Sequence, residues 1–366
     1  MKRIFDTDCE GPISKNDNAF EIAQNFIPDG SRFFAKLSKY DDLLADIDKK
    51  HGYKAGDTLR LILPFLKAYG VTDSIIQGYS AQNILIVPGA DLTLKHINSF
   101  MPVFIISTSY RPYINSLCDV VGFPVKNTFC TEVSLDKYEL PDSEIRDLKE
   151  LHDEILKLPE IDIPASAHKR EDLDNGTIKC AERLDQIFWN EFLMMVSEKM
   201  LDEVNPIGGF EKANAIRKSC DITDVQLSEV MYAGDSITDA DAMKLVSESG
   251  GIAISFNGNR YAIQSADVAC TSPNAMILTG FALLFNDYGT QAVRELASEW
   301  DQRKYEFESN INKMIPVTFR RATEEQNFTV KDVTLNLIEE SNIQELISQS
   351  ESFRKTVRGE SIGKLG

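Results

Sequence analysis

Short, mostly apolar segments that end near acidic or hydroxyl residues recur along this chain of 366 residues. These segments are 4–5, 103–106, 227–233, 252–255 and 268–269. A continuous apolar run that ends in polar residues is typical of a buried strand in a parallel sheet. Because helical patterns separate these runs, the sequence predicts an α/β fold with a parallel sheet.

Three stretches with helical spacing of apolar residues interrupt or follow this core. We expect a helical cap over 17–100, a second helical insertion over 142–204 and a helical C-terminal extension over 287–366. The core then consists of 1–16, 101–141 and 205–286. The charged second insertion is either a solvated helical pair or a substrate lid, and the end of the chain from Arg358 is expected to fray.

The composition excludes several classes of protein. With 57 acidic against 39 basic residues, the formal charge of −18 argues against nucleic-acid and anionic-membrane partners. No signal-peptide pattern follows the N-terminal Met, and the longest apolar stretch, near 275–285, is too short to span a bilayer. The six cysteines are widely spaced and predict reduced thiols. We therefore expect a cytoplasmic protein without membrane insertion.

The polar residues that follow the strands are the candidate site. Asp6, Asp8 and Glu10 follow the first strand, Ser107 follows the second, and Asp235 and Asp239 follow the third. Each alone could be a turn former or a helix cap, and Lys212, near a helix start, could be a surface lysine. Ligands bind at the carboxyl ends of parallel strands, so neighbouring strands would bring these groups together.

Such a set suits phosphoryl transfer. A carboxylate that attacks a phosphate dianion needs cations to reduce repulsion, and Mg²⁺ prefers oxygen ligands. A lysine neutralises charge, while hydroxyls and helix N-terminal amides bind phosphoryl oxygens. A second carboxyl group two residues from the nucleophile points to the same side of an extended chain and can exchange protons with the leaving group and water.

These motifs, with the Gly251–Ile254 and Ser265–Val268 stretches, resemble the haloacid dehalogenase (HAD) superfamily of phosphohydrolases. The resemblance covers about 1–16, 85–135 and 205–285, and the inserted cap is similar to that of the phosphoserine-phosphatase-like branch. It implies a HAD-like Rossmannoid sheet, a Mg²⁺ cofactor and an aspartyl-phosphate intermediate. Within the superfamily, the stretch from Asp8 through Asn18 resembles an uncharacterised archaeal group labelled as energy-converting hydrogenase A subunit R.

The resemblance implies roles for named residues. Asp8 would be the nucleophile and Glu10 the acid/base, with Asp6 and Asp8 as the alternative pair, because this chain has Gly11-Pro12 where the superfamily usually has Gly-Thr. Metal ligands and organisers would be Asp8, Glu10, Asp235 and Asp239. Substrate contacts would come from Ser107, Thr108, Ser109 and Lys212. Apart from the resemblance, Arg111, just past the hydroxyl cluster, and Asn16 to Asn18, at the first hinge, are candidate contacts from their positions alone.

The expected function is hydrolysis of a small phosphorylated metabolite, by one chain or as a homo-oligomer. Transfer of the phosphoryl group to an acceptor other than water is also open. The alternative from another class is a non-catalytic subunit that docks on a membrane-bound hydrogenase complex. A complete set of motifs argues against that alternative, since a scaffold has no use for Lys212 and both aspartates that follow the third strand.

Overall fold

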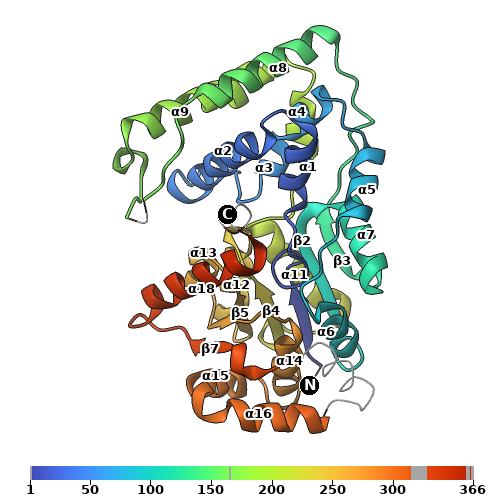
Figure 1. Ribbon diagram of the computed structural model, residues 1–366, viewed down its shortest axis with the longest axis vertical. Helices are drawn as coiled ribbons and strands as arrows, with labels where there is room; N and C mark the ends of the chain where they lie inside the picture. Colours follow the sequence, from blue (N-terminus) through green and yellow to red (C-terminus); the bar gives the residue numbers. More distant parts are fainter. Residues whose placement is uncertain (1, 165, 315–327, 360–362, 364–366) are drawn as a thin grey trace.

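The computed structural model describes residues 2–164, 166–314, 328–359 and 363. A seven-stranded sheet forms its centre, in the order β3-β2-β1-β4-β5-β6-β7 (Figure 1). The strands are β1 (Ile4–Thr7), β2 (Val103–Tyr110), β3 (Thr128–Thr131), β4 (Val230–Gly234), β5 (Ile252–Phe256), β6 (Val268–Thr271) and β7 (Thr334–Leu337). The first six strands pair in parallel, and β7 is antiparallel to β6. The predicted α/β class and parallel sheet are confirmed.

Helices cover both faces of the sheet because successive strand residues point to opposite sides. Ile4 packs in one apolar cluster, against α11 (Phe210–Thr223) and α12 (Ala240–Glu248). Phe5 packs in the other, with α6 (Ala90–Ile97), α7 (Arg111–Val121) and α14 (Met276–Tyr288). The same cluster receives side chains from α15 (Thr290–Ser298) and α16 (Trp300–Met314). Helix α6, predicted as part of the cap, therefore contributes to the core of the sheet.

A helical lobe lies over the carboxyl ends of the strands (Figure 1). From the first insertion it contains α1 (Asn18–Phe26), α2 (Gly30–Asp42), α3 (Thr58–Leu61), α4 (Leu63–Ala68) and α5 (Asp73–Gln82). From the second it contains α8 (Asp142–Lys157), α9 (Asn175–Gln186) and α10 (Glu198–Glu203). Two π-helical turns, 43–47 and 187–191, continue α2 and α9.

The two insertions share one apolar core. The ring of Phe65, from the first insertion, lies 6.3 Å from that of Phe188 and 6.0 Å from that of Phe192, both from the second. Lys36 on α2 is 2% exposed and donates to the Leu158 carbonyl at the end of α8, at 2.5 Å. The second insertion is therefore one half of the lobe, rather than an independent solvated helical pair.

The C-terminal extension differs from the wholly helical segment predicted. Residues 334–337 form β7, whose ladder places Leu337 opposite Val268 at the edge of the sheet. Helix α18 (Ile343–Arg358) then runs to the carboxyl ends of the strands, below the lobe (Figure 1). Of the end expected to fray, Arg358 forms part of the site described below, whereas 360–362 and 364–366 lie outside the described residues. A four-residue strand gives too short a pattern to separate from a helical segment.

Across the described ranges, no helix is both long enough and apolar enough to cross a membrane.

Candidate active site

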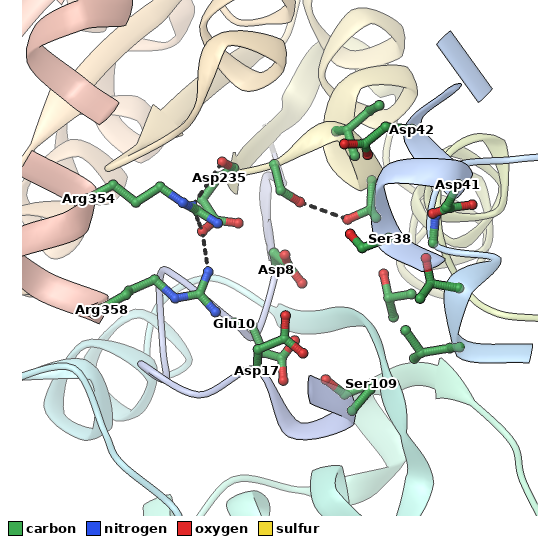
Figure 2. A pocket seen from close by; sticks show the side chains of 18 residues that line it. Asp8, Glu10, Asp17, Ser38, Asp41, Asp42, Ser109, Asp235, Arg354 and Arg358 are labelled. Carbon is green, nitrogen blue, oxygen red and sulfur yellow. Dashed lines mark hydrogen bonds and ion pairs between the residues drawn. The ribbon is translucent and has the colours of Figure 1, made fainter. Parts of the chain in front are cut away.

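The carboxyl ends of three adjacent strands bring the motif residues together. Strand β1 lies between β2 and β4, so Asp8, Ser109 and Asp235 reach the same edge of the sheet. A cavity with about 680 Å³ of empty space, partly open to solvent, separates this edge from the lobe (Figure 2). It is lined by Asp8, Glu10, Asp17, Ala19, Ser38, Asp41, Asp42, Gly56, Thr58, Leu59, Thr108, Ser109, Asp235, Ser236, Ile237, Thr238, Arg354 and Arg358.

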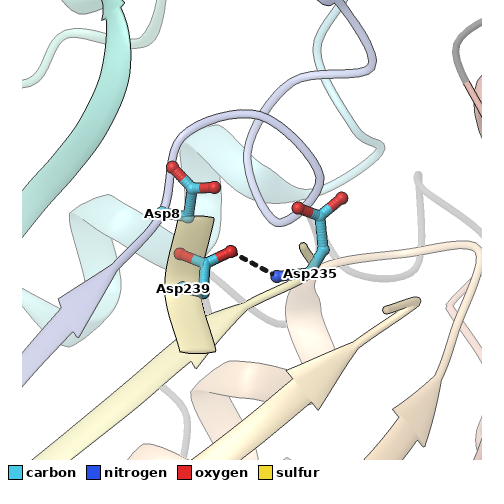
Figure 3. A group of neighbouring side chains, drawn as sticks. All are labelled: Asp8, Asp235 and Asp239. Atoms are coloured by element: carbon cyan, nitrogen blue, oxygen red, sulfur yellow. Dashed lines mark hydrogen bonds between the residues drawn. The ribbon is translucent and has the colours of Figure 1, made fainter. Parts of the chain in front are cut away.

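Asp8 and Asp235 line the floor of this cavity, and Asp239 and Lys212 lie buried beneath it. Oxygens of Asp8, Asp235 and Asp239 all lie within 4.8 Å of one another (Figure 3). Lys212, near the start of α11, is fully buried, and its Nζ lies 2.9 Å from Asp8 Oδ1 and 2.7 Å from Asp239 Oδ1. The lysine thus neutralises two carboxylates that come from different strand ends.

Asp239 is held by donors on all sides. Its Oδ1 accepts from Tyr232 at 2.6 Å as well as from Lys212, and its Oδ2 accepts from the amides of Asp235 and Ser236 at 2.9 and 3.0 Å. A Cβ built on Gly234 would lie 2.5 Å from Asp239 Cγ. Only glycine leaves room for the chain to fold back at this position, which explains the Gly-Asp sequence after β4.

Burial and charge set the pKa values of these groups. Burial, followed by the charge of Asp239, raises the pKa of Asp8 to about 8, although the charge of Lys212 opposes this shift. Burial also raises the pKa of Asp239, but the charge and hydrogen bond of Lys212 more than offset it, so that pKa lies below its usual value. Asp239 is therefore the ionised partner of Lys212.

Glu10 lies in the loop after β1 and lines the cavity together with Asp8 (Figure 2). Burial, with a contribution from the charge of Asp17, raises the pKa of Glu10 well above its usual value, against the charge of Arg358. Its Oε1 accepts from the Asn18 amide at 2.8 Å. Burial thus favours the protonated form of Glu10, the form that can donate a proton at the cavity wall.

Gly11 lets the loop after β1 approach Asp235. Its φ is +109°, and a Cβ built there would lie 2.3 Å from Asp235 Oδ2. A side chain would therefore meet both an unfavourable backbone conformation and a carboxylate.

The structure places Asp6 away from the cavity. Asp6 is fully buried beneath Asp8, between β1 and α11, where its Oδ2 accepts from the Ser219 hydroxyl at 2.5 Å. Lys212 and Ser219 are two turns apart on the same face of α11, so the helix pairs Asp8 with a cation and Asp6 with a hydroxyl group.

Of the three hydroxyl residues at the end of β2, two line the cavity and one does not. Thr108 and Ser109 line the cavity, whereas the Ser107 hydroxyl accepts from the Ser109 amide at 3.1 Å behind it. Arg111 lies outside the cavity lining: its Nε donates to Glu132 at 2.8 Å and its Nη1 to Thr128 at 2.6 Å. Of the Asn16 to Asn18 stretch, Asp17 lines the cavity and caps α1 through the Phe20 amide at 3.0 Å.

The lobe contributes to the cavity through its first insertion. Asp41 and Asp42 at the end of α2 face the sheet edge, and Asp41 Oδ2 accepts from the Gly56 amide at 2.8 Å (Figure 2). Gly56 has φ +96°, and a Cβ there would lie 2.9 Å from Thr108 Cγ2. This close contact between the lobe and β2 fixes the roof of the cavity.

Two arginines from α18 complete the site. Arg354 Nη1 donates to the Asp235 carbonyl at 3.1 Å and is ion-paired with Asp235 Oδ2, and Arg358 Nη1 donates to the same carboxylate oxygen at 2.9 Å. Sequence reasoning missed both arginines, because an Arg pair four residues apart near the end of a charged helix gives no distinguishing signal. It also missed Tyr232, Asp41 and Asp42.

The donor set fits a Mg²⁺ ion. Asp8 Oδ1 accepts from Lys212 and from the Cys9 amide, and Asp235 Oδ2 accepts from the two arginines. Asp8 Oδ2 and Asp235 Oδ1 therefore have no hydrogen-bond donor among the described residues. Mg²⁺ keeps several waters when it binds to a protein, so these two free carboxylate oxygens and the Glu10 backbone carbonyl would suffice as its protein ligands. Asp239, with both oxygens occupied, can act only behind these ligands, through Lys212 and the Asp235 amide.

Comparisons with known proteins extend this description. No protein-family model and no curated protein matches the chain. A solved structure of a gene product from Archaeoglobus fulgidus is 26% identical, with a TM-score of 0.79 over 100% of this chain and 99% of that chain. A substrate-bound phosphoserine phosphatase complex is 13% identical (TM-score 0.46, covering 77% and 98%), and a phospho-aspartyl intermediate analogue of phosphoserine phosphatase is 14% identical (0.44, 73% and 92%).

The Archaeoglobus protein shares the fold through the C-terminal extension as well as the core. The sheet, parallel from β3 through β6, and the helical insertion between β1 and β2 give the present chain the α/β architecture that the sequence predicted.

Proposed function

We propose that this protein is a Mg²⁺-dependent phosphomonoester hydrolase that acts on a small phosphorylated metabolite through an aspartyl-phosphate. The observation that supports it best is the floor of the cavity. There Lys212 joins Asp8 to Asp239, and Asp235 lies within 4.8 Å of both carboxylates. A buried carboxylate with a cation beside it, open to a cavity, is what nucleophilic attack on a phosphate ester requires.

Each residue then has a defined role. Asp8 attacks phosphorus, and Glu10 donates its proton to the leaving alkoxide as the ester bond breaks. Glu10 then removes a proton from water, which attacks the phosphorus of the aspartyl-phosphate and releases inorganic phosphate and free Asp8. The Ser109 hydroxyl, which has no hydrogen-bond partner among the described residues, binds a phosphoryl oxygen. The Thr108 hydroxyl instead donates to the Ile207 carbonyl at 3.0 Å, and Ser107 fixes the end of β2 by accepting from the Ser109 amide.

The position of Asp6 supports Asp8 and Glu10 over Asp6 and Asp8 as the nucleophile and acid/base pair. Asp6 does not line the cavity, whereas both members of the preferred pair do. Mg²⁺, held by Asp8, Asp235 and the Glu10 carbonyl, would supply positive charge that stabilises the ionised nucleophile and the transferring group. The enclosing lobe favours a small substrate.

Phosphate release from a panel of small phosphomonoesters, with Mg²⁺ or with EDTA, tests this proposal. We expect metal-dependent release that Asp8→Asn abolishes and Asp6→Asn leaves measurable, both variants being folded by circular dichroism. Loss of turnover in both variants would favour Asp6 and Asp8 as the pair, and retained turnover in Asp8→Asn would refute the mechanism, because Asp8 is essential in either pair. No release from any ester, together with no Mg²⁺ binding by calorimetry, would refute the proposal and favour a non-catalytic subunit.

A further inference from the structure

The cavity contains few positive charges for an anionic substrate. Six carboxyl groups line it: Asp8, Glu10, Asp17, Asp41, Asp42 and Asp235. Lys212 lies beneath the floor and is already shared between Asp8 and Asp239. Arg354 and Arg358 are the only cationic side chains that line the cavity within the described ranges, and both come from α18.

The two arginines have hydrogen-bond donors to spare. A guanidinium carries five N–H groups. Arg358 donates one from Nε to the Lys15 carbonyl at 3.3 Å, one from Nη1 to Asp235 and one from Nη2 to the Asn16 carbonyl. Two remain. Arg354 bonds through Nη1 alone among the described residues, so its Nη2 keeps both N–H groups, whereas its unpartnered Nε is buried.

Helix α18 is attached to the sheet without help from the arginines. Ser350 donates to the Gly258 carbonyl at 2.6 Å, and Glu351 accepts from the Arg260 amide at 3.1 Å. Leu346 packs against Ile263 and Ala269. Because these contacts hold the helix in place, the arginines are not needed as its only anchors.

We propose that α18 supplies the anion-binding group of this site, with Arg354 and Arg358 binding the non-bridging oxygens of the substrate's phosphoryl group. This inference rests on the proposed function and adds the C-terminal helix to its substrate-binding residues. A planar guanidinium presents paired donors that match phosphate oxygens. Asp235, bonded to both arginines, holds the two forks at the cavity wall (Figure 2).

The test measures binding of inorganic phosphate by calorimetry in the presence of Mg²⁺, together with kcat and KM for the preferred ester. In Arg354→Gln and Arg358→Gln we expect phosphate affinity about 10- to 100-fold weaker and KM raised by a similar factor, the loss typical of a charge-assisted hydrogen bond. Arg358→Lys should recover part of the affinity. Lys355→Gln, which removes a charge from the same helix outside the cavity, should match the wild type.

Phosphate affinity within threefold of the wild type in both glutamine variants would overturn the inference and leave the arginines as positioners of Asp235. Tighter Mg²⁺ binding with faster turnover and unchanged phosphate affinity would also overturn it, because α18 would then block the metal site. If the wild type neither binds phosphate nor hydrolyses any ester, the proposed function fails instead.

Discussion

Removal of the charge of Lys212 should reduce stability strongly. Its Nζ is fully buried and lies 2.7 Å from Asp239 Oδ1. At that separation, an effective dielectric constant of about 20 gives an attraction of about 6 kcal/mol before the charges' desolvation is counted. Because desolvation offsets part of this, loss of one partner from a buried pair costs about 3–5 kcal/mol. We expect Lys212→Met to lower the free energy of unfolding by that amount near neutral pH.

Asp239 makes this effect depend on pH. Burial raises the pKa of Asp239, but Lys212 more than offsets this, so the pKa in the folded state lies below the unfolded value near 3.8. The ionised carboxylate therefore stabilises the fold above the unfolded pKa, and this stability is lost as pH falls through the folded pKa. In Lys212→Met, the buried carboxyl group lacks its cation, and its pKa rises above the unfolded value. Such a group favours the folded state at low pH and loses that contribution as pH rises. The deficit of the variant should therefore grow with pH, by at most about 1.4 kcal/mol per pH unit for each carboxyl group.

Urea unfolding followed by circular dichroism, with EDTA present, measures this deficit at about pH 5.5 and about pH 8. Lys355→Met, which removes a charge from α18 outside the cavity, should change stability by less than about 0.5 kcal/mol. The reasoning is refuted if Lys212→Met stays within about 1 kcal/mol of the wild type at both pH values. A large deficit that is independent of pH would assign the loss to packing rather than to Asp239.

Two further variants test the loop after β1 and the buried Asp6 on that strand. Gly11→Ala should weaken Mg²⁺ binding measured by calorimetry, because a Cβ 2.3 Å from Asp235 Oδ2 displaces that carboxylate. Gly52→Ala is the control: its φ is also positive (+75°), but nothing lies within 4 Å of its Cβ, so it should share only the backbone strain of about 1–2 kcal/mol. Equal Mg²⁺ affinity in the two variants would contradict the contact. Burial raises the pKa of Asp6 to about 8 against the hydrogen bond from Ser219, so its contribution to stability is full below about pH 4 and is lost as pH rises through about 8. Asp6→Asn should flatten the fall in stability over that range in urea titrations, and an unchanged slope would exclude Asp6 as its source.

The sheet and the floor of the site could be predicted because local patterns encode them. A buried parallel strand needs a continuous apolar run, and its carboxyl end is where polar groups can meet a ligand. Asp8, Asp235 and Asp239 follow from that rule and Lys212 from the resemblance, and the structure brings the four together. Asp6 has the same sequence signature as Asp8, and only the packing of α11 separates their environments.

The walls of the cavity could not be predicted, because tertiary packing decides them. The two insertions are 41 residues apart in the sequence, yet their aromatic side chains form one core, and no periodicity within either insertion indicates the other. Arg354 and Arg358 depend on β7, a four-residue edge strand that turns the chain back so that α18 ends at Asp235. Such long-range placement leaves no pattern in a single sequence.

The charges of the cavity connect these two parts of the site. In the proposed mechanism Asp8 must be ionised to attack phosphorus. Burial and the charge of Asp239 raise its pKa to about 8, so that mechanism needs added positive charge near neutral pH. The charge of Lys212 already opposes this rise in the pKa of Asp8. Arg354 and Arg358 add charge from the other side, through Asp235, and a cation bound at the free oxygens of Asp8 and Asp235 would add more. The acidic floor encoded by the core motifs thus needs cations from elsewhere, and the C-terminal helix supplies two of them.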